Sequence, residues 1–280
     1  MPAKILDGRK LAERIQNDVA EKVRARVQQH KPAPGLAVIL VGENSASKIY
    51  VAHKQKACKT VGIYSECHPL LSTTNQKTIE VLIDQLNQNP LIHGILLQLP
   101  LPETVNADIL LERIDPKKDV DGLHPYNLGR LVQRRPLLRP CTPLGIMTLL
   151  KTTGENLSGK HAVVVGASNI VGRPMALELL MEKCTVTVCH SATKPLSQYV
   201  QSADILISAT GYRGLIHSDW IKPGAIVIDV GIHRSDNGEL TGDIDFDTAR
   251  ERASWITPVP GGVGPMTVAM LLQNTLMAAQ

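Results

Sequence analysis

Residues 160–175 read KHAVVVGASNIVGRPM and combine a short apolar run with a turn that contains two glycines. His161–Val165 is a short β-branched run, which suits a strand buried on both faces of a parallel sheet and is too short for a helix. Gly166 ends the run and Gly172 stands where a helix begins, so the N–H groups between them can face an anion at the helix N-terminus. The pattern differs from G-x-G-x-x-G, because Ser168 replaces a glycine and the outer glycines stand one residue further apart. A nucleotide turn is favoured, with a plain strand-to-helix turn as the alternative.

The residues that follow this turn favour NADP over NAD. Cys184–Cys189 reads as the next strand, so His190 and Ser191 come about 20 residues after the turn, where an NAD-binding chain carries an acid for the ribose 2′-hydroxyl. This chain has no acid there. His190, Ser191, Thr193 and Lys194 instead offer hydrogen-bond donors and a positive charge, which suit a 2′-phosphate.

Further strands are predicted over Asp204–Ser208, Ala225–Val230 and Trp255–Ile256. Gly211 and Gly231 follow the first two of them, at the carboxyl edge where such sheets bind ligands.

The composition is that of a soluble, globular chain long enough for two domains. Its 280 residues are 43% hydrophobic with a net charge of +4. No apolar run approaches the ~18 residues of a membrane span, and the start lacks a secretory pattern, so the cytoplasm is the expected location. The five cysteines include no C-x-x-C pair and are expected to be free thiols. The modest charge and the scarcity of aromatic residues argue against a nucleic-acid surface and suit small anionic ligands.

A second α/β pattern precedes the nucleotide turn. Helices are predicted over Asp7–His30, Ser45–Val61 and Gln76–Leu86, and they alternate with strands over Leu36–Val41, Ile63–Leu70 and Ile92–Leu99. Such alternation predicts a parallel sheet. The fold class is therefore α/β with two parallel-sheet domains. Residues 1–139 form the first domain and residues 140–265 form the Rossmann-type domain. The apolar helix within 266–280 has no strand left to follow, so we expect it to return to the first domain.

One helix face and one strand end carry candidate catalytic residues. Ser47, Tyr50 and Lys54 lie at i, i+3 and i+7 and therefore project from one face of the predicted helix. A solvated helix face is the plainer interpretation. Gln98 closes the third strand at the carboxyl edge of the sheet, where it is either a site residue or a capped strand end.

Two loops and one helix start complete the candidate residues. Asp119 and Asp121 lie in the polar loop DPKKDVDGLH, where hydrogen-bond acceptance is favoured over metal binding because further ligands are lacking. Thr142 is predicted as the N-cap of a helix over Pro143–Lys151. The glycine-rich stretch TPVPGGVGPMT, residues 257–267, can bring backbone close to a ligand or form a stiff turn.

Taken together, the motifs resemble one family closely, the bifunctional methylenetetrahydrofolate dehydrogenase/cyclohydrolases of one-carbon metabolism. The resemblance rests on separated motifs in the right order, almost from end to end: Tyr50-x-x-x-Lys54, GILLQLPLP (94–102), DVDGLH (119–124), PCTPLG (140–145), VVVGASNIVGRP (163–174) and PVPGGVGPMT (258–267). It implies an N-terminal catalytic domain, a C-terminal NADP-binding domain, a folate substrate with or without a polyglutamate tail, and a homodimer formed through the nucleotide domains.

The resemblance also implies roles for individual residues. Lys54 would carry the proton in hydrolysis, Gln98 would hold Lys54, Tyr50 would stack on the folate, and Asp121 would accept hydrogen bonds from the pterin edge. Substrate-binding residues would be Ser47, Tyr50, Leu99, Pro100, Asp121, Pro260, Gly261 and Gly262. Cofactor-binding residues would be Gly166, Ala167, Ser168, Ile170, His190, Ser191, Thr193, Gly211, Gly231 and Ile232. Many members carry Arg where this chain has Ala167, so NADP binding is expected to depend more on Ser191 and its neighbours.

Two other functions fit parts of the pattern. One is a different two-domain dehydrogenase, for instance one for a hydroxy acid, with Lys54 and Asp121 as an acid/base pair and turnover without folate. The other is a non-catalytic NADP sensor, which would bind the nucleotide and turn over no folate.

Overall fold

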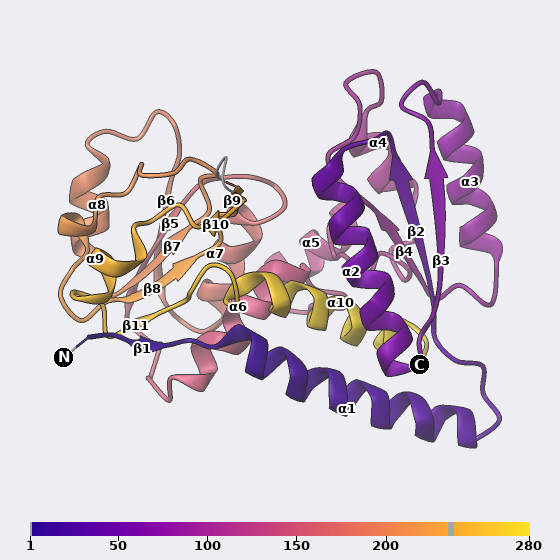
Figure 1. The fold of residues 1–280 in the computed structure, drawn as a ribbon, viewed down its shortest axis with the longest axis horizontal. Helices are drawn as coiled ribbons and strands as arrows, with labels where there is room; N and C mark the ends of the chain where they lie inside the picture. Colours follow the sequence, from indigo (N-terminus) through magenta and orange to yellow (C-terminus); the bar gives the residue numbers. More distant parts are fainter. Residues whose placement is uncertain (1, 235–237) are drawn as a thin grey trace. The chain divides into compact units, whose positions relative to one another are not determined.

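A computed structural model describes residues 2–234 and 238–280, and the chain divides into two compact units (Figure 1). The three-stranded unit comprises Glu13–Cys141 with Val268–Gln280. The six-stranded unit comprises the chain up to Ala12 with Thr142–Thr267. Each unit therefore contains two separate segments of the sequence.

The three-stranded unit is built on a parallel sheet, as the alternating pattern predicted. Its strand order is β3-β2-β4, with β2 Gly35–Val41, β3 Tyr64–Leu70 and β4 Gly94–Leu97. Its helices are α2 Ser45–Val61, α3 Gln76–Gln88, α4 Ala107–Arg113 and α5 Pro125–Val132, and α1 spans Gly8–Gln28. In Figure 1, α2 and α3 flank the sheet.

Burial explains why β2 is a continuous apolar run. All its residues are buried, and alternate side chains, those of Ala37, Ile39 and Val41, pack with Ile79 and Ile83 of α3. Each of these two isoleucines is fully buried and contributes about 1.5–3 kcal/mol of stability. Both faces of β2 are thus buried, and the contacts with α3 help to hold the carboxyl edge of the sheet in place for the loops that follow.

The six-stranded unit is a parallel sheet with the order β1-β11-β8-β7-β5-β6. Its strands are β1 Lys4–Ile5, β5 His161–Val165, β6 Thr185–Cys189, β7 Ile205–Ser208, β8 Ile226–Asp229 and β11 Trp255–Ile256. A small antiparallel pair, β9 His233–Arg234 and β10 Leu240–Thr241, follows β8. The helices are α6 Cys141–Thr152, α7 Gly172–Met181, α8 Leu196–Ser202, the 3-10 turn η1 Ser218–Trp220 and α9 Phe246–Arg250. Helix α10, Val263–Ala278, begins in this unit, and its residues from Val268 onward belong to the three-stranded unit.

The order of the strands determines where this sheet can bind a ligand. The chain passes from β5 to β6 on one side and then to β7 on the other, so the strand order reverses between β5 and β7. In open α/β sheets, the crevice beyond the carboxyl ends at such a reversal is the usual ligand site. The loops that follow Val165 and Ser208 lie at this reversal and are therefore the expected place for a ligand.

Three features differ from the sequence-based expectations. The predicted first domain began at residue 1, but β1 pairs with β11 of the six-stranded unit. Helix α6 begins at Cys141, so the prediction of Thr142 as its N-cap is wrong. The Thr142 hydroxyl lies 2.8 Å from that of Thr267 instead. Helices α4 and α5 were not predicted, because both are short and depend on tertiary packing.

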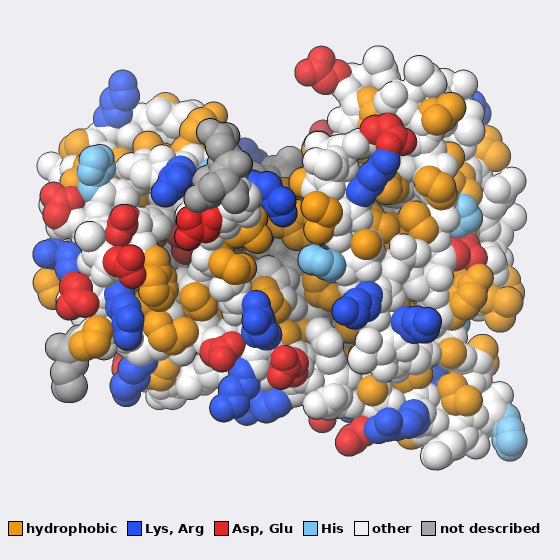
Figure 2. Space-filling model, in the orientation of Figure 1, with side chains coloured by type: hydrophobic (Ala, Val, Ile, Leu, Met, Phe, Trp, Pro, Cys, Tyr) orange, Lys and Arg blue, Asp and Glu red, His pale blue; other side chains and the backbone are white. Residues whose placement is uncertain are grey.

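The surface carries charges of both signs. On the face shown in Figure 2, Lys and Arg side chains alternate with Asp and Glu side chains and with apolar ones. Within residues 2–234 and 238–280, no helix is long and apolar enough to cross a membrane.

Candidate active site

Lys54 and Gln98 form a hydrogen-bonded pair in the three-stranded unit. The Lys54 ammonium donates to Oε1 of Gln98 at 2.9 Å. Nε2 of Gln98 donates to the carbonyl oxygen of Leu99 at 2.7 Å, and this bond turns Oε1 toward the lysine. The hydrogen-bond partner of the Lys54 ammonium in this pair is therefore a neutral amide and not a carboxylate.

The face of α2 that carries Lys54 is not solvated. Helix α2 starts at a side-chain cap, because Asn44 Oδ1 accepts from the N–H of Ser47 at 3.0 Å. Ser47 is 3% exposed and Lys54 is 8% exposed, so the plainer interpretation of a solvated face is wrong. Tyr50 is half-buried, and burial raises the pKa of its hydroxyl. Leu99 is half-buried and Pro100 is exposed, just beyond Gln98.

Asp119 shapes the loop that leads to Asp121. Its carboxylate accepts from the N–H of His124 at 2.8 Å, from the N–H of Leu123 at 3.2 Å and from Nδ2 of Asn127 at 2.8 Å. Asp119 also bridges to Ile95 of β4, so the loop runs beside that strand. Its oxygens are thus used as hydrogen-bond acceptors. No cluster of three or more metal-ligating side chains occurs among the described residues.

Asp121 lies in the same neighbourhood as Lys54. Burial raises the pKa of the Cys141 thiol well above its ordinary value; the negative charge of Asp121 also raises it, whereas the positive charge of Lys54 lowers it. Both charged groups therefore act on the same thiol. The N–H of Cys141 donates to the carbonyl oxygen of Asp121 at 3.2 Å, which fixes the loop backbone.

The glycine-rich loop before α10 belongs to the six-stranded unit. The N–H of Arg9 donates to the carbonyl oxygen of Gly261 at 2.9 Å. A Cβ on Gly8 would overlap the carbonyl oxygen of Gly262, so the start of α1 packs directly on this loop. Pro260 is exposed beside it. The loop is thus anchored from one side and presents its proline to solvent.

The turn after β5 is as tight as the sequence required. Gly166 has a φ of +117°, and a Cβ there would overlap the carbonyl oxygen of Ala209 after β7. A Cβ on Gly172 would overlap the carbonyl oxygen of Gly166. The Ser168 hydroxyl accepts from the N–H of Val171 at 3.2 Å. This cradle, at the reversal of strand order, fits the phosphates of a dinucleotide.

Arg173 was not among the predicted cofactor residues. Its Nε donates to the carbonyl oxygen of Ala167 at 3.0 Å, so part of the guanidinium lies against the turn. The sequence places a cation in the first turn of the helix. Its contact with Ala167 could not be recognised, because the two residues stand six positions apart.

The end of β6 presents exposed polar groups. The N–H of His190 donates to the Thr193 hydroxyl at 3.0 Å, and the N–H of Ala192 lies 3.3 Å from His190 Nδ1. Ser191 is exposed at the tip of this small turn, and Ile170 is exposed in the loop after β5. The predicted residues thus lie at the carboxyl ends of neighbouring strands of one sheet.

The loops after β7 and β8 hold the remaining predicted cofactor residues. Gly211 is exposed after β7, and Gly231 and Ile232 follow β8, the former buried and the latter 45% exposed. Sequence reasoning missed Asp243, which binds both loops. An acid just before a helix start suggests only a cap, and the cap of α9 is in fact Asp245.

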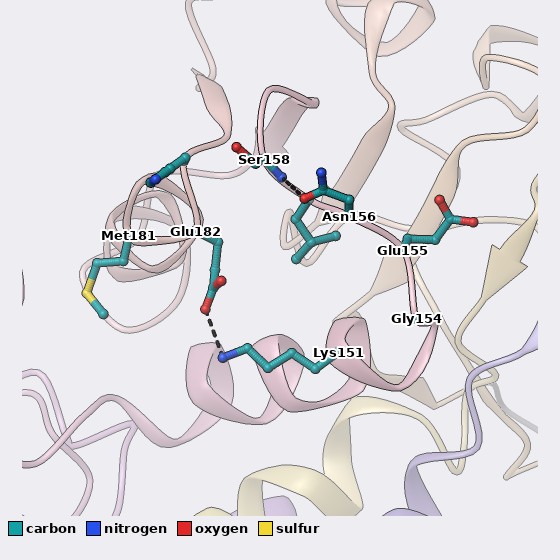
Figure 3. Close-up of a pocket in the computed structure, with 9 residues that line it drawn as sticks. Lys151, Gly154, Glu155, Asn156, Ser158, Met181 and Glu182 are labelled. Carbon is teal, nitrogen blue, oxygen red and sulfur yellow. Dashed lines mark hydrogen bonds and ion pairs between the residues drawn. The ribbon is translucent and has the colours of Figure 1, made fainter.

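A surface hollow of about 460 Å³ lies elsewhere on the six-stranded unit (Figure 3). Its lining includes an ion pair between Lys151 and Glu182 at 2.8 Å and a hydrogen bond from the N–H of Ser158 to Asn156 at 3.1 Å. Ser158 precedes β5 and Lys183 precedes β6, so the hollow is at the amino ends of these strands. It is therefore at the opposite edge from the nucleotide turn.

The sheet order, the glycine turn and the polar carboxyl edge define the six-stranded unit as a Rossmann-type nucleotide-binding domain. Family models agree. The tetrahydrofolate dehydrogenase/cyclohydrolase catalytic domain matches residues 6–121, and the NAD(P)-binding domain of the same family matches residues 140–280.

Solved structures of whole chains are similar as well. The bifunctional FolD methylenetetrahydrofolate dehydrogenase/cyclohydrolase of Campylobacter jejuni is 48% identical with a TM-score of 0.97, over 99% of this chain and 98% of that one. The Trypanosoma brucei enzyme, solved with NADP and an inhibitor, is 41% identical with a TM-score of 0.95, over 100% of this chain and 98% of that one. A methylenetetrahydrofolate dehydrogenase from Bombyx mori is 41% identical with a TM-score of 0.93, over 99% and 98%. The chain belongs to the tetrahydrofolate dehydrogenase/cyclohydrolase family.

Proposed function

We propose that this protein is a bifunctional NADP-dependent 5,10-methylenetetrahydrofolate dehydrogenase and 5,10-methenyltetrahydrofolate cyclohydrolase. The first reaction converts methylenetetrahydrofolate and NADP⁺ to the methenyl cation and NADPH. The second adds water to that cation and opens the ring, which gives 10-formyltetrahydrofolate and releases a proton. The observation that carries the proposal is the hydrogen bond between the buried Lys54 and the half-buried Gln98, with Asp121 in the same neighbourhood, inside the region that matches the family's catalytic domain.

The dehydrogenase step depends on alignment. The methenyl cation is stabilised by resonance between two nitrogens, so hydride loss needs no strong acid or base from the protein. Bound NADP supplies the hydride acceptor. Tyr50 orients the folate by stacking, and Asp121 accepts hydrogen bonds from the 2-amino group and the ring N–H of the pterin.

Other residues contribute to folate binding by their position. Ser47, Leu99 and Pro100 lie on α2 and just after β4 and form further folate contacts. Pro260, Gly261 and Gly262 offer backbone to the substrate.

The cyclohydrolase step depends on proton transfer. Water addition and ring opening move protons at near-neutral pH, and a positioned side chain contributes about 10²–10⁴-fold to such a step. Lys54 is the group that transfers these protons. Within residues 2–234 and 238–280, the hydrogen bond to Gln98 is the one that its ammonium makes, and its other N–H groups can donate to the substrate.

The cofactor is NADP, held by the turn after β5 and by the loops after β6, β7 and β8. Two observations support NADP as the cofactor. In the turn after β5, a Cβ on Gly166 or on Gly172 would overlap backbone atoms, and position 191 carries Ser where an NAD-binding chain would carry an acid. The 2′-phosphate would be held by Ser191 and its neighbours, and the pyrophosphate by the turn through Ala167 and Ser168.

We further propose that the enzyme is a cytoplasmic homodimer formed through its six-stranded units. All five cysteines are free thiols, which suits a reducing compartment. The choice of the six-stranded units as the interface is what the resemblance of the motifs to the family implies. Light scattering after size-exclusion chromatography will give the mass in solution, and a monomer at micromolar concentration would contradict the dimer.

One absorbance assay tests the proposed activities. Methylenetetrahydrofolate and NADP are mixed with the enzyme, and NADPH and the methenyl intermediate are followed together. We expect NADPH to form only when folate is present, and added methenyltetrahydrofolate to disappear without nucleotide. NADP reduction with a hydroxy acid alone, or nucleotide binding without turnover, would contradict the proposal.

A further inference from the structure

The carboxylate of Asp243 lies fully buried between two loops of the six-stranded unit. Its Oδ2 accepts from the Ser208 hydroxyl at 2.9 Å, from the N–H and the hydroxyl of Thr210 at 2.9 and 2.8 Å, and from the N–H of Gly211 at 3.3 Å. Its Oδ1 lies 2.8 Å from Nε2 of His233. Ser208 is the last residue of β7, and Thr210 and Gly211 follow it. His233 lies in the segment that follows β8. One side chain therefore connects the loops after two adjacent strands.

The carboxylate is charged in this setting. Burial opposes the charged form, but the hydrogen bonds from His233, Thr210 and Ser208 outweigh that effect and hold the pKa of Asp243 below its ordinary value. Hydrogen bonds to an ionised acceptor are roughly twice as strong as neutral ones. The two loops are accordingly held more firmly than neutral contacts would hold them.

The loop after β8 is shaped around this carboxylate. A Cβ on Gly231 would overlap Oδ1 of Asp243, so a side chain at 231 would displace the acid. Asp229 has the reciprocal arrangement. Its Oδ1 accepts from the N–H groups of Gly231 at 2.9 Å and Asp243 at 3.0 Å, and a Cβ on Gly242 would overlap its Oδ2. The carboxylate of Asp243 therefore occupies the space beside Gly231, and that of Asp229 occupies the space beside Gly242. These contacts fix the course of the loop.

We infer that Asp243 is a positioning residue for the nucleotide, which holds Gly211 and the Gly231–His233 loop in the geometry that receives the cofactor. The inference rests on the proposed function, in which these loops line the NADP site. Asp243 itself is 0% exposed, so it acts through the loops and does not touch the cofactor.

Two variants and a matched control test this inference. Asp243→Ala removes all the links, whereas Asp243→Asn keeps the volume and one acceptor oxygen. Asp245→Ala is the control, because Asp245 caps α9 by accepting from the N–H of Thr248 at 3.0 Å, and within residues 2–234 and 238–280 its side chain makes no hydrogen bond to Gly211 or to Gly231–His233. The measurements are the Kd for NADP by titration calorimetry, KM and kcat of the dehydrogenase, and the nucleotide-independent cyclohydrolase rate.

We expect Asp243→Ala to raise the Kd and KM for NADP roughly tenfold or more, since several hydrogen bonds to a charged acceptor are lost. Asp243→Asn should lie between this variant and the parent, and it provides the test if the alanine variant does not fold. The cyclohydrolase rate should stay at the parent value, and Asp245→Ala should lower the melting temperature without changing the Kd.

The inference is overturned if the Kd for NADP of Asp243→Asn equals that of the parent. It is also overturned if the variants lose both activities equally, because that result would mean general destabilisation. Failure of the proposed function is a separate outcome, since the parent enzyme would then not reduce NADP with folate at all.

Discussion

Asn274 of α10 donates through Nδ2 to the carbonyl oxygen of Val120 at 2.9 Å, and Val120 is the residue before Asp121. The same nitrogen donates to the carbonyl oxygen of Arg139 at 2.9 Å. Asn274 is 1% exposed, so these bonds are made in the interior of the three-stranded unit. A residue close to the end of the chain thus fixes the backbone that presents a predicted folate ligand.

Asn274→Ala should destabilise the three-stranded unit. It removes two hydrogen bonds to backbone carbonyl oxygens, each with a net contribution of about 0.5–1.5 kcal/mol. The Val120 carbonyl oxygen still accepts from Sγ of Cys141 at 3.2 Å. Urea unfolding followed by circular dichroism will measure the loss, with exposed Gln273→Ala as the control on the same helix. A parent-like unfolding midpoint for Asn274→Ala would show that these bonds contribute nothing to stability.

Lys54→Met should separate the two activities. It keeps the length and the apolar stem of the side chain and removes the proton carrier, so cyclohydrolase activity should fall by at least ~100-fold. Some dehydrogenase activity should survive, and methenyl product should accumulate. The control is Lys56→Met, an exposed position on the same helix. Hydrolysis at the parent rate by Lys54→Met would rule out the proposed role of Lys54.

Asp121→Ala should weaken folate binding and leave NADP binding intact. It removes one or two charge-assisted hydrogen bonds, each worth ~1.5–3 kcal/mol, so both activities should fall together. Asp121→Asn keeps the shape without the charge and should fall between the alanine variant and the parent. Calorimetric titration with folate is the measurement, and unchanged affinity in both variants would mean that Asp121 only shapes its loop.

Ser191→Asp should change the choice of cofactor. A carboxylate at the end of β6 would repel the 2′-phosphate of NADP and suit the 2′-hydroxyl of NAD. A like-charge cost of a few kcal/mol predicts a loss of NADP affinity of roughly a hundredfold, with much less effect on NAD. Ser158→Asp places the same charge at the opposite edge of the sheet and should have little effect. Equal losses for both cofactors in Ser191→Asp would show that residue 191 does not contact the phosphate.

Asp229 should make the stability of the six-stranded unit depend on pH. Burial raises the pKa of Asp229 from 3.8 to about 6, although the N–H groups of Ile244, Asp243 and Gly231 favour the charged form. The folded state therefore binds the proton more tightly than the unfolded state. The resulting contribution to stability is present below about pH 4 and is lost as the pH rises through about 6, by about 3 kcal/mol.

The comparison that isolates this effect is with Asp229→Asn, which cannot titrate. Both tryptophans, Trp220 and Trp255, belong to the six-stranded unit, so their fluorescence reports its unfolding in urea. Between pH 4 and pH 7 the parent should lose stability relative to the variant. A stability difference that does not change with pH would show that Asp229 titrates normally.

Local patterns predicted those parts of the fold that depend on neighbours in sequence. The strand at His161–Val165 and the helix at Ser45–Val61 have the bounds that β-branching and apolar spacing indicated. The start of α6 was misplaced because the Thr142 hydroxyl lies beside that of Thr267, a residue far along the chain. Strand β1 was missed because a two-residue strand is defined by its partner β11 and not by its own sequence.

The residues of the candidate site also fall into those that local patterns predict and those that depend on contacts with distant parts of the chain. Lys54 and Gln98 could be proposed from the sequence, since each lies on a strongly patterned element at a sheet edge. Asp243 and Asn274 could not, because an acid in a loop and an amide in an apolar helix acquire meaning only from the distant groups they bind. Buried polar residues that join remote loops leave little trace in a single sequence.

The pairing of Lys4–Ile5 with Trp255–Ile256 also has a consequence for how the protein is made. During translation, the first strand emerges from the ribosome long before its partner exists. The edge of the six-stranded sheet stays open until Trp255 is synthesised, and Asn274 reaches the other unit later still. Neither unit can therefore finish folding before its later segment, Thr142–Thr267 or Val268–Gln280, has been synthesised, and no single cut in the polypeptide would yield two fragments that each contain a whole unit.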